Sequence, residues 1–549
     1  MKKMLFTLVA AAGAALLFVS CGQKKMTPDE QFKAVLRNGV MSSTNKFANG
    51  FHENFNQINK SSFGADGTFS IELDEKNAPL IRGIFTAAVP DLNLDWFNSI
   101  QISSNSTLKD EDIAVTLGLG VNSVNIVSLE CIEDLGQSKV YISIPELLKQ
   151  YFKIDAKENY SLQETFALYL AELKLLKTAP SEKVFTGFVE EILDATLADI
   201  SGVERGEQSL QAGLSSSKTV SADFTTLSFA LSEEWCETTA KNVKKAVLSS
   251  ENLKTILDWI LPIGRGILYE DISTKEVVKA LADSFEEAYE DLGYEQLTLT
   301  LYADSKSNLK GLKIGDRKDV VESKFVQNGS SFGYTFSAKE GKNELVALNG
   351  FGSYSGGKMT GDFKVFADDE DIFSFSTKNL DLEGLQALKA NGTVSFKLTE
   401  ELQRELRREL RYTLDKNTLS LIDGLTITLN MAQKDRKSGS AELVLGTSEK
   451  DSYFKIKAEG KYSSGSRVSI PKDAVDVMEL DDDEALEYVK AIDLSTVVRN
   501  LKKAKVEKEY VDAISEFNGE ALANIIESYT NPYGSSRYNN RADNYDWWN

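Results

Sequence analysis

Residues Asp112–Val121 read DIAVTLGLGV, a stretch in which apolar side chains occupy every second position. A period of two places these side chains on one face of a β-strand. The same alternation appears in two neighbouring segments, at Phe69, Ile71 and Leu73 and at Val140, Ile142 and Ile144. Turn-forming residues separate the segments at 74–77 and 109–112. The sequence therefore predicts an antiparallel sheet over residues 61–145.

Alternation returns over residues 293–470, where short glycine-rich turns separate one strand-like segment from the next. Examples are Leu297, Leu299 and Leu301, then Val394, Phe396 and Leu398, and then Leu425, Ile427 and Leu429. Loops this short make sequential strands neighbours in a sheet, and the twist of a long meander tends to curl it. We expect a curved meander, interrupted by short helical segments near 382–388 and 400–411.

Between these two regions, residues 146–292 show the 3.6-residue period of helices. Two capping boxes are present, Ser161 with Glu164 and Ser273 with Glu276. One apolar stripe lies between 180 and 201, and a further helix from Ser232 ends in the apolar run 255–269, while 220–231 resembles a strand. The predicted fold class is α+β: a large curved antiparallel β-sheet meander with inserted helices packed on one face and with C-terminal helices.

After this body, which spans 61–477, residues 478–529 are again predicted to be helical, with the acidic residues 481–484 at an amino end. The last segment, 530–549, is rich in Asn, Tyr and Gly and is predicted to be disordered. Its Tyr545, Trp547 and Trp548 are candidate docking residues for a partner or a membrane surface. The alternative is a terminus with no such role.

The N-terminus has the pattern of a secretory signal. Lys2 and Lys3 precede an apolar run over 4–19, and Ser20 then stands before Cys21. The run is shorter than the roughly 20 residues that a membrane span needs. This segment resembles bacterial lipoprotein signals, although Phe18 stands where Leu is usual. The resemblance implies a signal peptide over 1–20, a lipidated Cys21 and a tether over 21–60. Gly22 after the cysteine implies an outer-membrane location in a Gram-negative envelope, on either face.

Composition excludes several classes of function. The chain has 549 residues, 42% of them hydrophobic, and a formal net charge of −21, which disfavours a nucleic-acid partner. A single histidine, His52, argues against most metal centres and histidine-based catalysis. Besides Cys21, only Cys131 and Cys236 remain, and they either form one disulfide in an oxidising compartment or are two separate buried thiols.

Short motifs that could indicate an enzyme lack the context that their chemistry needs. Gly329–Gly333 has the spacing of a nucleophile elbow, and Gly352–Lys358 that of a phosphate loop, but strand-like residues follow each one. Both are interpreted as hairpin turns. The acidic residues 368–371 lack the spacing of a calcium loop. We therefore expect a non-enzymatic protein with no metal and no cofactor.

Three longer stretches resemble uncharacterised bacterial exported lipoproteins of unknown function: KVYISIPELLKQYFKID (139–155), LTLTLYADSKSNLKGLKI (297–314) and FGYTFSAKEGKNELVALNGFGSYSGGKMTGDFKV (332–365). The similarity lies in the order of elements over 61–477. A strand is followed by Pro145, Glu146 and Leu147, then by helices and then by hairpins. This order is also similar to that of the periplasmic lipoprotein-carrier and lipid-carrier lipoprotein folds, which implies an apolar cavity. Those families carry no sequence motif for their ligand, so the resemblance assigns no site residue.

The expected function is therefore the binding of a lipid or another apolar ligand by a membrane-anchored lipoprotein of the cell envelope. The apolar segment of the helical region supplies the candidate cavity residues, which are Ile256, Leu257, Trp259, Ile260, Leu261, Ile263 and Leu268. The alternative for these residues is an ordinary packed core. The alternative function is a structural or interaction protein of the envelope that engages a protein partner.

Overall fold

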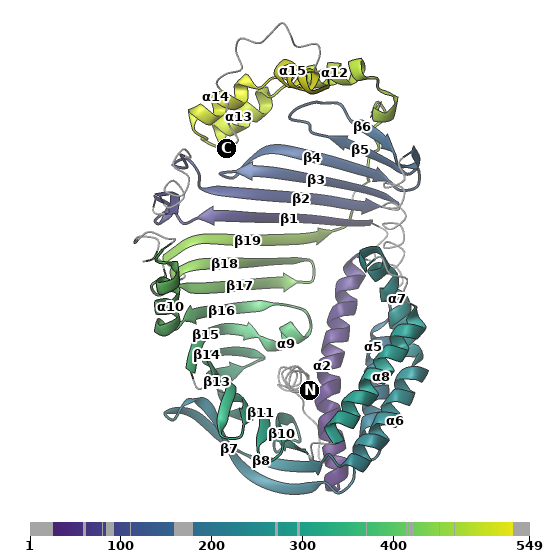
Figure 1. Cartoon of the computed structure of the whole chain (residues 1–549), viewed down its shortest axis with the longest axis vertical. Coiled ribbons are helices and arrows are strands. Elements are labelled where there is room, and N and C mark those ends of the chain that lie inside the picture. The colour runs from purple at the N-terminus through teal and green to yellow at the C-terminus, as the bar shows by residue number, and fades with distance from the viewer. Residues whose placement is uncertain are drawn as a thin grey trace. The chain divides into compact units, whose positions relative to one another are not determined.

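The computed structural model describes residues 26–58, 62–79, 81–83, 93–109, 111–158, 179–268, 273–293, 297–368, 370–412, 416, 419, 422–448, 451–465 and 467–530. The fold is α+β, as predicted, with a large open sheet of 20 strands in which nearly all pairings are antiparallel (Figure 1). The chain divides into two compact units. Unit 1 comprises Met1–Asn59 and Ala171–Ser452, and unit 2 comprises Lys60–Leu170 and Tyr453–Asn549.

Unit 1 contains a helical layer and a long meander. Its helices are α2 (Pro28–Ile58), α5 (Glu182–Leu197), α6 (Glu233–Ser249), α7 (Glu251–Leu268), α8 (Thr274–Gly293), α9 (Leu382–Gln386) and α10 (Glu400–Leu410). The capping box predicted at Ser273 is present, because Ser273 N–H donates to Glu276 Oε2 at 2.9 Å and Glu276 N–H donates to Ser273 Oγ at 3.3 Å. The two short helices expected within the meander are α9 and α10.

The strands of unit 1 are β7 (Glu204–Ser215), β8 (Lys218–Ala230), β9 (Thr298–Ala303), β10 (Leu309–Gly315), β11 (Asp319–Asn328), β12 (Ser331–Glu340), β13 (Asn343–Ser355), β14 (Lys358–Ala367), β15 (Glu370–Asp381), β16 (Asn391–Leu398), β17 (Thr426–Asp435) and β18 (Ser438–Ser448). From β7 to β18 each strand pairs with the next in antiparallel register. The strands from β9 to β18 lie in the meander predicted from residue 293 onward, and β7 and β8 extend it. The two glycine motifs are the β11–β12 and β13–β14 turns, with Gly329, Gly356 and Gly357 at positive φ.

Helix α2 corrects the prediction of a tether that extends to residue 60. Residues 28–58 form one helix, and Phe32 and Val35 on it are 0% and 1% exposed. They belong to a core cluster that also contains Leu227, Phe229 and Leu301 from the sheet. A segment that buries this much apolar surface is an integral part of unit 1 and cannot serve as a solvated spacer. Figure 1 shows α2 lying beside α5.

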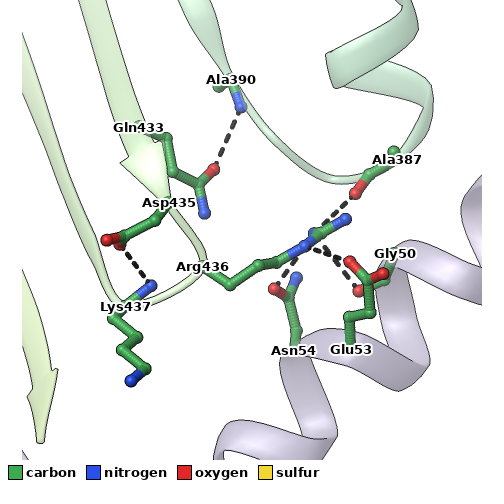
Figure 2. A network of polar contacts seen from close by, with 9 residues as sticks. All are labelled: Gly50, Glu53, Asn54, Ala387, Ala390, Gln433, Asp435, Arg436 and Lys437. Carbon is green, nitrogen blue, oxygen red and sulfur yellow. Dashed lines mark hydrogen bonds and ion pairs between the residues drawn. The ribbon is translucent and has the colours of Figure 1, made fainter.

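The far end of α2 is fixed to the sheet by Arg436, in the turn between β17 and β18. Arg436 Nε donates to Glu53 Oε2 at 2.6 Å, and its Nη1 donates to Asn54 Oδ1 at 3.2 Å and to the carbonyl oxygens of Gly50 and Ala387 at 3.4 and 2.8 Å. Figure 2 shows the guanidinium group lying between α2 and the segment after α9. One side chain therefore satisfies acceptors on two elements that are far apart in the sequence.

Unit 2 is built on a second run of strands: β1 (Ser62–Leu73), β2 (Ser99–Lys109), β3 (Asp112–Val121), β4 (Val124–Asp134), β5 (Lys139–Ser143), β6 (Phe152–Asp155), β19 (Asp451–Ser463, of which 453 onward belongs to this unit) and β20 (Val475–Asp476). The pairing order is β19, β1, β2, β3, β4, β5, β6 and β20. All pairs are antiparallel except β6 with β20.

The described C-terminal part of unit 2 forms the helices α12 (Asp482–Lys490), α13 (Ser495–Lys503), α14 (Lys508–Glu516) and α15 (Gly519–Thr530). The acidic start predicted for this region is a capping box between Asp481 and Glu484. Helices α13 and α14 pack on one face of β4, where Ile126 joins a cluster with Leu501 and Val511 (Figure 1). Asn122 Nδ2 donates to the carbonyl oxygen of Ala504 at 2.7 Å and links the β3–β4 turn to these helices.

Several sequence-based predictions fall outside the described residues. They are the signal peptide with Cys21, the cap formed by Ser161 and Glu164, and the tail aromatics Tyr545, Trp547 and Trp548. Among the helices that the structure describes, none combines the length and apolar content required to cross a membrane.

Candidate apolar binding face

The strand registers of unit 2 collect its alternating apolar residues on one side of the sheet. Phe69 on β1 lies opposite Ile102 on β2, and Ile102 lies opposite Leu119 on β3. Ile71 lies opposite Ile100 in the same way. We call this surface the apolar face, and its members are Phe69, Ile71, Ile100, Ile102, Leu117, Leu119, Val127 and Leu129. Each strand contributes every second residue, which is the pattern that identified β1 and β3 in the sequence.

Unlike the usual apolar side of a sheet, this face is open to solvent. The exposed fractions are 44% for Phe69, 36% for Ile100, 50% for Ile102, 42% for Leu117, 41% for Leu119 and 39% for Leu129. Single exposed apolar residues are ordinary on protein surfaces, but contiguous patches above a few hundred Å² are rare on monomers and mark binding surfaces. The register makes these six residues cross-strand neighbours, so they form one patch.

The opposite side of the same strands is polar and partly covered. Glu72 on β1 pairs with Lys457 on β19 at 2.6 Å, and Asn105 on β2 hydrogen bonds to Asp66 on β1. At β4 this polar side is covered by α13 and α14. Helices α13 and α14 therefore pack on the side of the sheet opposite to the apolar face.

Unit 1 shows what a filled apolar side looks like. A row of rings crosses its strands, with centroid distances of 6.0 Å from Phe332 to Phe363, 4.7 Å from Phe363 to Phe375 and 5.7 Å from Phe375 to Phe396. Phe332 is 0% exposed, whereas Phe396 at the other end is 38% exposed. Aromatic rings fill space in this row, while the residues of the apolar face in unit 2 leave their surface open.

Glu133 and Cys131 lie at one end of the apolar face, on β4. Cys131 lies opposite Val115 on β3, and Glu133 lies opposite Ile113. Burial raises the pKa of the Glu133 carboxyl group. Burial also raises the pKa of the Cys131 thiol, and the nearby Glu133 raises it further. Both groups are therefore held toward their neutral forms.

The two cysteines considered for a disulfide are free thiols in the structure. Cys131 is half-buried on β4 of unit 2, and Cys236 is completely buried in α6 of unit 1. Burial raises the pKa of Cys236 to about 11. Of the two alternatives left open by the sequence, the structure contains the pair of separate thiols.

The candidate cavity residues of α7 do not form one wall. Leu257 and Leu261 pack in a cluster with residues of α6 and α8, and Trp259 contacts the rings of Phe51 and Phe55 on α2. Ile260 is 47% exposed, and Ile256 is half-buried. The side chains of Ile263 and Leu268 lie outside the described residues. The sequence predicted one helix from Ser232 through this run, whereas the structure has two, α6 and α7. The buried apolar residues of α7 pack against neighbouring helices.

A depression on the surface of α6 and α8 offers a different kind of site. It is lined by Lys241, Lys244, Lys245, Leu248, Ser249 and Glu286. Lys244 pairs with Glu286 and, at 2.9 Å, with Asp283, and these hydrogen bonds raise the pKa of Lys244. Since these carboxylates already neutralise the central lysine, the depression has little excess charge for an anion.

Other polar candidates are accounted for by local structure. Among the described residues, no group of three or more His, Cys, Asp and Glu side chains is placed to hold a metal ion. Asp368 and Asp371 lie at the β14–β15 turn, where Asp371 pairs with Lys364 at 2.6 Å. Comparison of the chain with family models, with curated proteins and with solved structures finds no match.

Proposed function

We propose that this protein is a non-enzymatic binding protein for an apolar ligand, whose hydrocarbon chain lies on the apolar face of unit 2. The observation that carries the proposal is the group of six large side chains on that face, each 36–50% exposed. Apolar surface left in water costs about 25 cal/mol per Å², so covering these residues with a hydrocarbon chain is favourable.

The composition of the face favours a hydrocarbon over a protein partner. The eight members of the apolar face are aliphatic or aromatic, and the polar groups that β2 adds on this side are the hydroxyls of Ser104 and Ser106. Protein interfaces place polar residues and about one hydrogen bond per 100–200 Å² around an apolar centre. A lipid chain needs no such bonds, which makes it the better match to this surface.

The expected lipid anchor at Cys21 would bring the protein close to a source of hydrocarbon chains. Lipid at Cys21 would hold the protein at an envelope membrane, where acyl chains are the abundant apolar ligand. Radioactive palmitate labelling of the protein and of its Cys21→Ala variant tests the anchor. We expect label only in the unchanged protein, and equal labelling of both would show that Cys21 is not the attachment site.

Ligand binding is tested with the Cys21→Ser protein purified without detergent. The uncharged dye N-phenyl-1-naphthylamine reports apolar sites by its fluorescence, and we expect saturable enhancement with the protein. Phe69→Lys places a charge in the apolar face and should weaken dye binding about tenfold, since a desolvated charge opposes an apolar ligand.

The matched control is Thr68→Lys, which adds the same charge one residue away on the opposite side of β1. Thr68 is exposed and lies opposite Glu459 on β19, so a lysine fits there. We expect this variant to bind the dye normally. Equal loss in both variants, or no saturable binding by the unchanged protein, would refute the proposed function and would favour a site for a protein partner.

A further inference from the structure

The end of the apolar face carries one carboxyl group that lies among hydrocarbon. Glu133 on β4 lies between Ile113 on β3 and Val140 on β5, and two residues before it Cys131 lies between Val115 and Ile142. Alternation along β4 puts Leu129, Cys131 and Glu133 on the same side of the sheet. With a rise of about 3.3 Å per residue, Glu133 stands roughly 13 Å from Leu129 along the strand.

The carboxylate of Glu133 has no ionic or hydrogen-bonding partner in the part of the chain that the structure describes. Neither flanking strand supplies a charge on this side, because the ionisable neighbours Asp112, Asp134 and Lys139 alternate to the other side of the sheet. On β3, β4 and β5, within the described residues, the titratable group on the same side as Glu133 is the Cys131 thiol, whose pKa Glu133 raises. Partial burial disfavours the charged form of a carboxyl group that has no counter-charge, and Glu133 is half-buried at the end of an exposed apolar surface.

We infer that Glu133 binds the cationic headgroup of an amphipathic ligand whose hydrocarbon chain lies on the apolar face. This inference rests on the proposed function and specifies its ligand class. An ammonium group would supply the counter-charge that the described part of the chain does not provide. The net charge of −21 acts in the same direction, because it attracts cationic amphiphiles and repels anionic ones.

Burial raises the pKa of Glu133, so binding of a cationic ligand should depend on pH. A cationic ligand stabilises the ionised carboxylate, so it binds best above the pKa of Glu133 and more weakly as the pH falls through it. An uncharged ligand on the same face should show no such dependence. Cys131 does not titrate in this window, because its thiol pKa is raised above the ordinary value.

The test measures displacement of N-phenyl-1-naphthylamine by two detergents below their micelle concentrations, cationic dodecyltrimethylammonium and uncharged dodecyl maltoside. For the Glu133→Gln variant we expect about tenfold weaker binding of the cationic detergent, which is the size of effect for one charge-assisted contact, and unchanged binding of the uncharged one. Glu459→Gln removes an exposed carboxylate on the polar side of β19 and should change neither. Circular dichroism checks that both variants are folded.

The outcomes separate this inference from the proposed function. If dodecyl maltoside and the dye bind and Glu133→Gln weakens only the cationic detergent, with loss of its pH dependence, the headgroup site is established. If each detergent binds the Glu133→Gln protein as tightly as it binds the unchanged protein, the headgroup assignment is wrong and the apolar face remains the proposed binding site. If neither detergent nor the dye binds the unchanged protein, the proposed function itself fails.

Discussion

Arg436 and Ala387 are joined by a hydrogen bond of 2.8 Å from the guanidinium Nη1 to the carbonyl oxygen, and the same nitrogen also reaches Gly50 and Asn54 on α2. The side chain of Arg436 is only 18% exposed. Its contacts connect the end of α2 to the meander of unit 1, and their loss leaves several half-buried acceptors without a donor.

Replacing Arg436 by alanine should therefore lower the free energy of unfolding by about 2–3 kcal/mol. Arg436→Lys should recover only a small part of this, because an ammonium group cannot copy the planar fork of donors. Lys437→Ala is the control, since Lys437 is exposed and its side chain points away from the network (Figure 2). Urea denaturation measures all three variants, and equal stability of the Arg436→Ala and Lys437→Ala proteins would contradict this role.

Helix α2 comes so close to the residue that follows α9 that Gly50 should not tolerate a side chain. A Cβ atom at Gly50 would overlap the carbonyl carbon and oxygen of Ala387, which are backbone atoms that cannot move aside. At Gly39, on the same helix, the added Cβ would meet Leu309 Cδ2 at 2.8 Å, and this is the end of a flexible side chain. Both changes gain about 1 kcal/mol of helix propensity. We expect Gly50→Ala to be destabilising by thermal denaturation and Gly39→Ala to be close to neutral.

Truncations in the core and on the apolar face should differ sharply in cost. Leu227 is 0% exposed in the core of unit 1, and Leu227→Ala should cost about 3–4 kcal/mol through lost burial and the cavity left behind. Ile102 is 50% exposed, so Ile102→Ala should cost less than about 1 kcal/mol. A large loss of stability in Ile102→Ala, measured in urea, would mean that the apolar face is a packed surface in solution.

The Glu133 carboxyl group should make the stability of unit 2 depend on pH. Because burial raises its pKa in the folded state, the folded protein holds a proton that the unfolded chain has already released. Stability should consequently fall as the pH rises from the ordinary glutamate pKa through the higher folded value. Glu133→Gln should remove this part of the decline and leave the protein more stable at pH 8. Chemical denaturation from pH 4 to 8 compares the two proteins, and parallel curves would contradict the prediction.

Thiol reactivity checks the assignment of the two cysteines. Cys236 is completely buried and burial raises its pKa to about 11, so it should resist iodoacetamide until the protein is unfolded. Peptide mapping without reductant should find both Cys131 and Cys236 as free thiols. A peptide pair linked through these residues would overturn the assignment.

Most of the strands could be predicted from the sequence because alternation reports directly on sheet geometry. The strand β7 was not predicted, since Leu210 and Ala212 are its only buried members and polar residues dominate the rest. Helix α2 was interpreted as a tether, because its apolar positions are separated by many polar ones and it follows an expected lipid anchor.

The site was harder to predict than the fold, for a physical reason. Alternation shows that Phe69, Ile102 and Leu119 share one side of a sheet, and apolar sides are normally buried. Whether a side is covered depends on packing by distant segments, which no local pattern encodes. The exposure of these residues, and the isolation of Glu133 among them, emerged only from the three-dimensional structure.

The pairing of β1 with β19 has a consequence for the order in which the chain can fold. Phe69, near the start of the described chain, lies opposite Ala458, near its end, and the whole sheet segment of unit 1 is synthesised between them. Until β19 has been synthesised, β1 and β2 belong to an incomplete sheet with an unpaired edge and an exposed apolar side. The strands of unit 1 are all synthesised before β19 is complete. Non-local pairings of this kind form slowly, and unpaired strand edges promote aggregation. Newly made chains should therefore depend on helper proteins that protect β1 until β19 arrives.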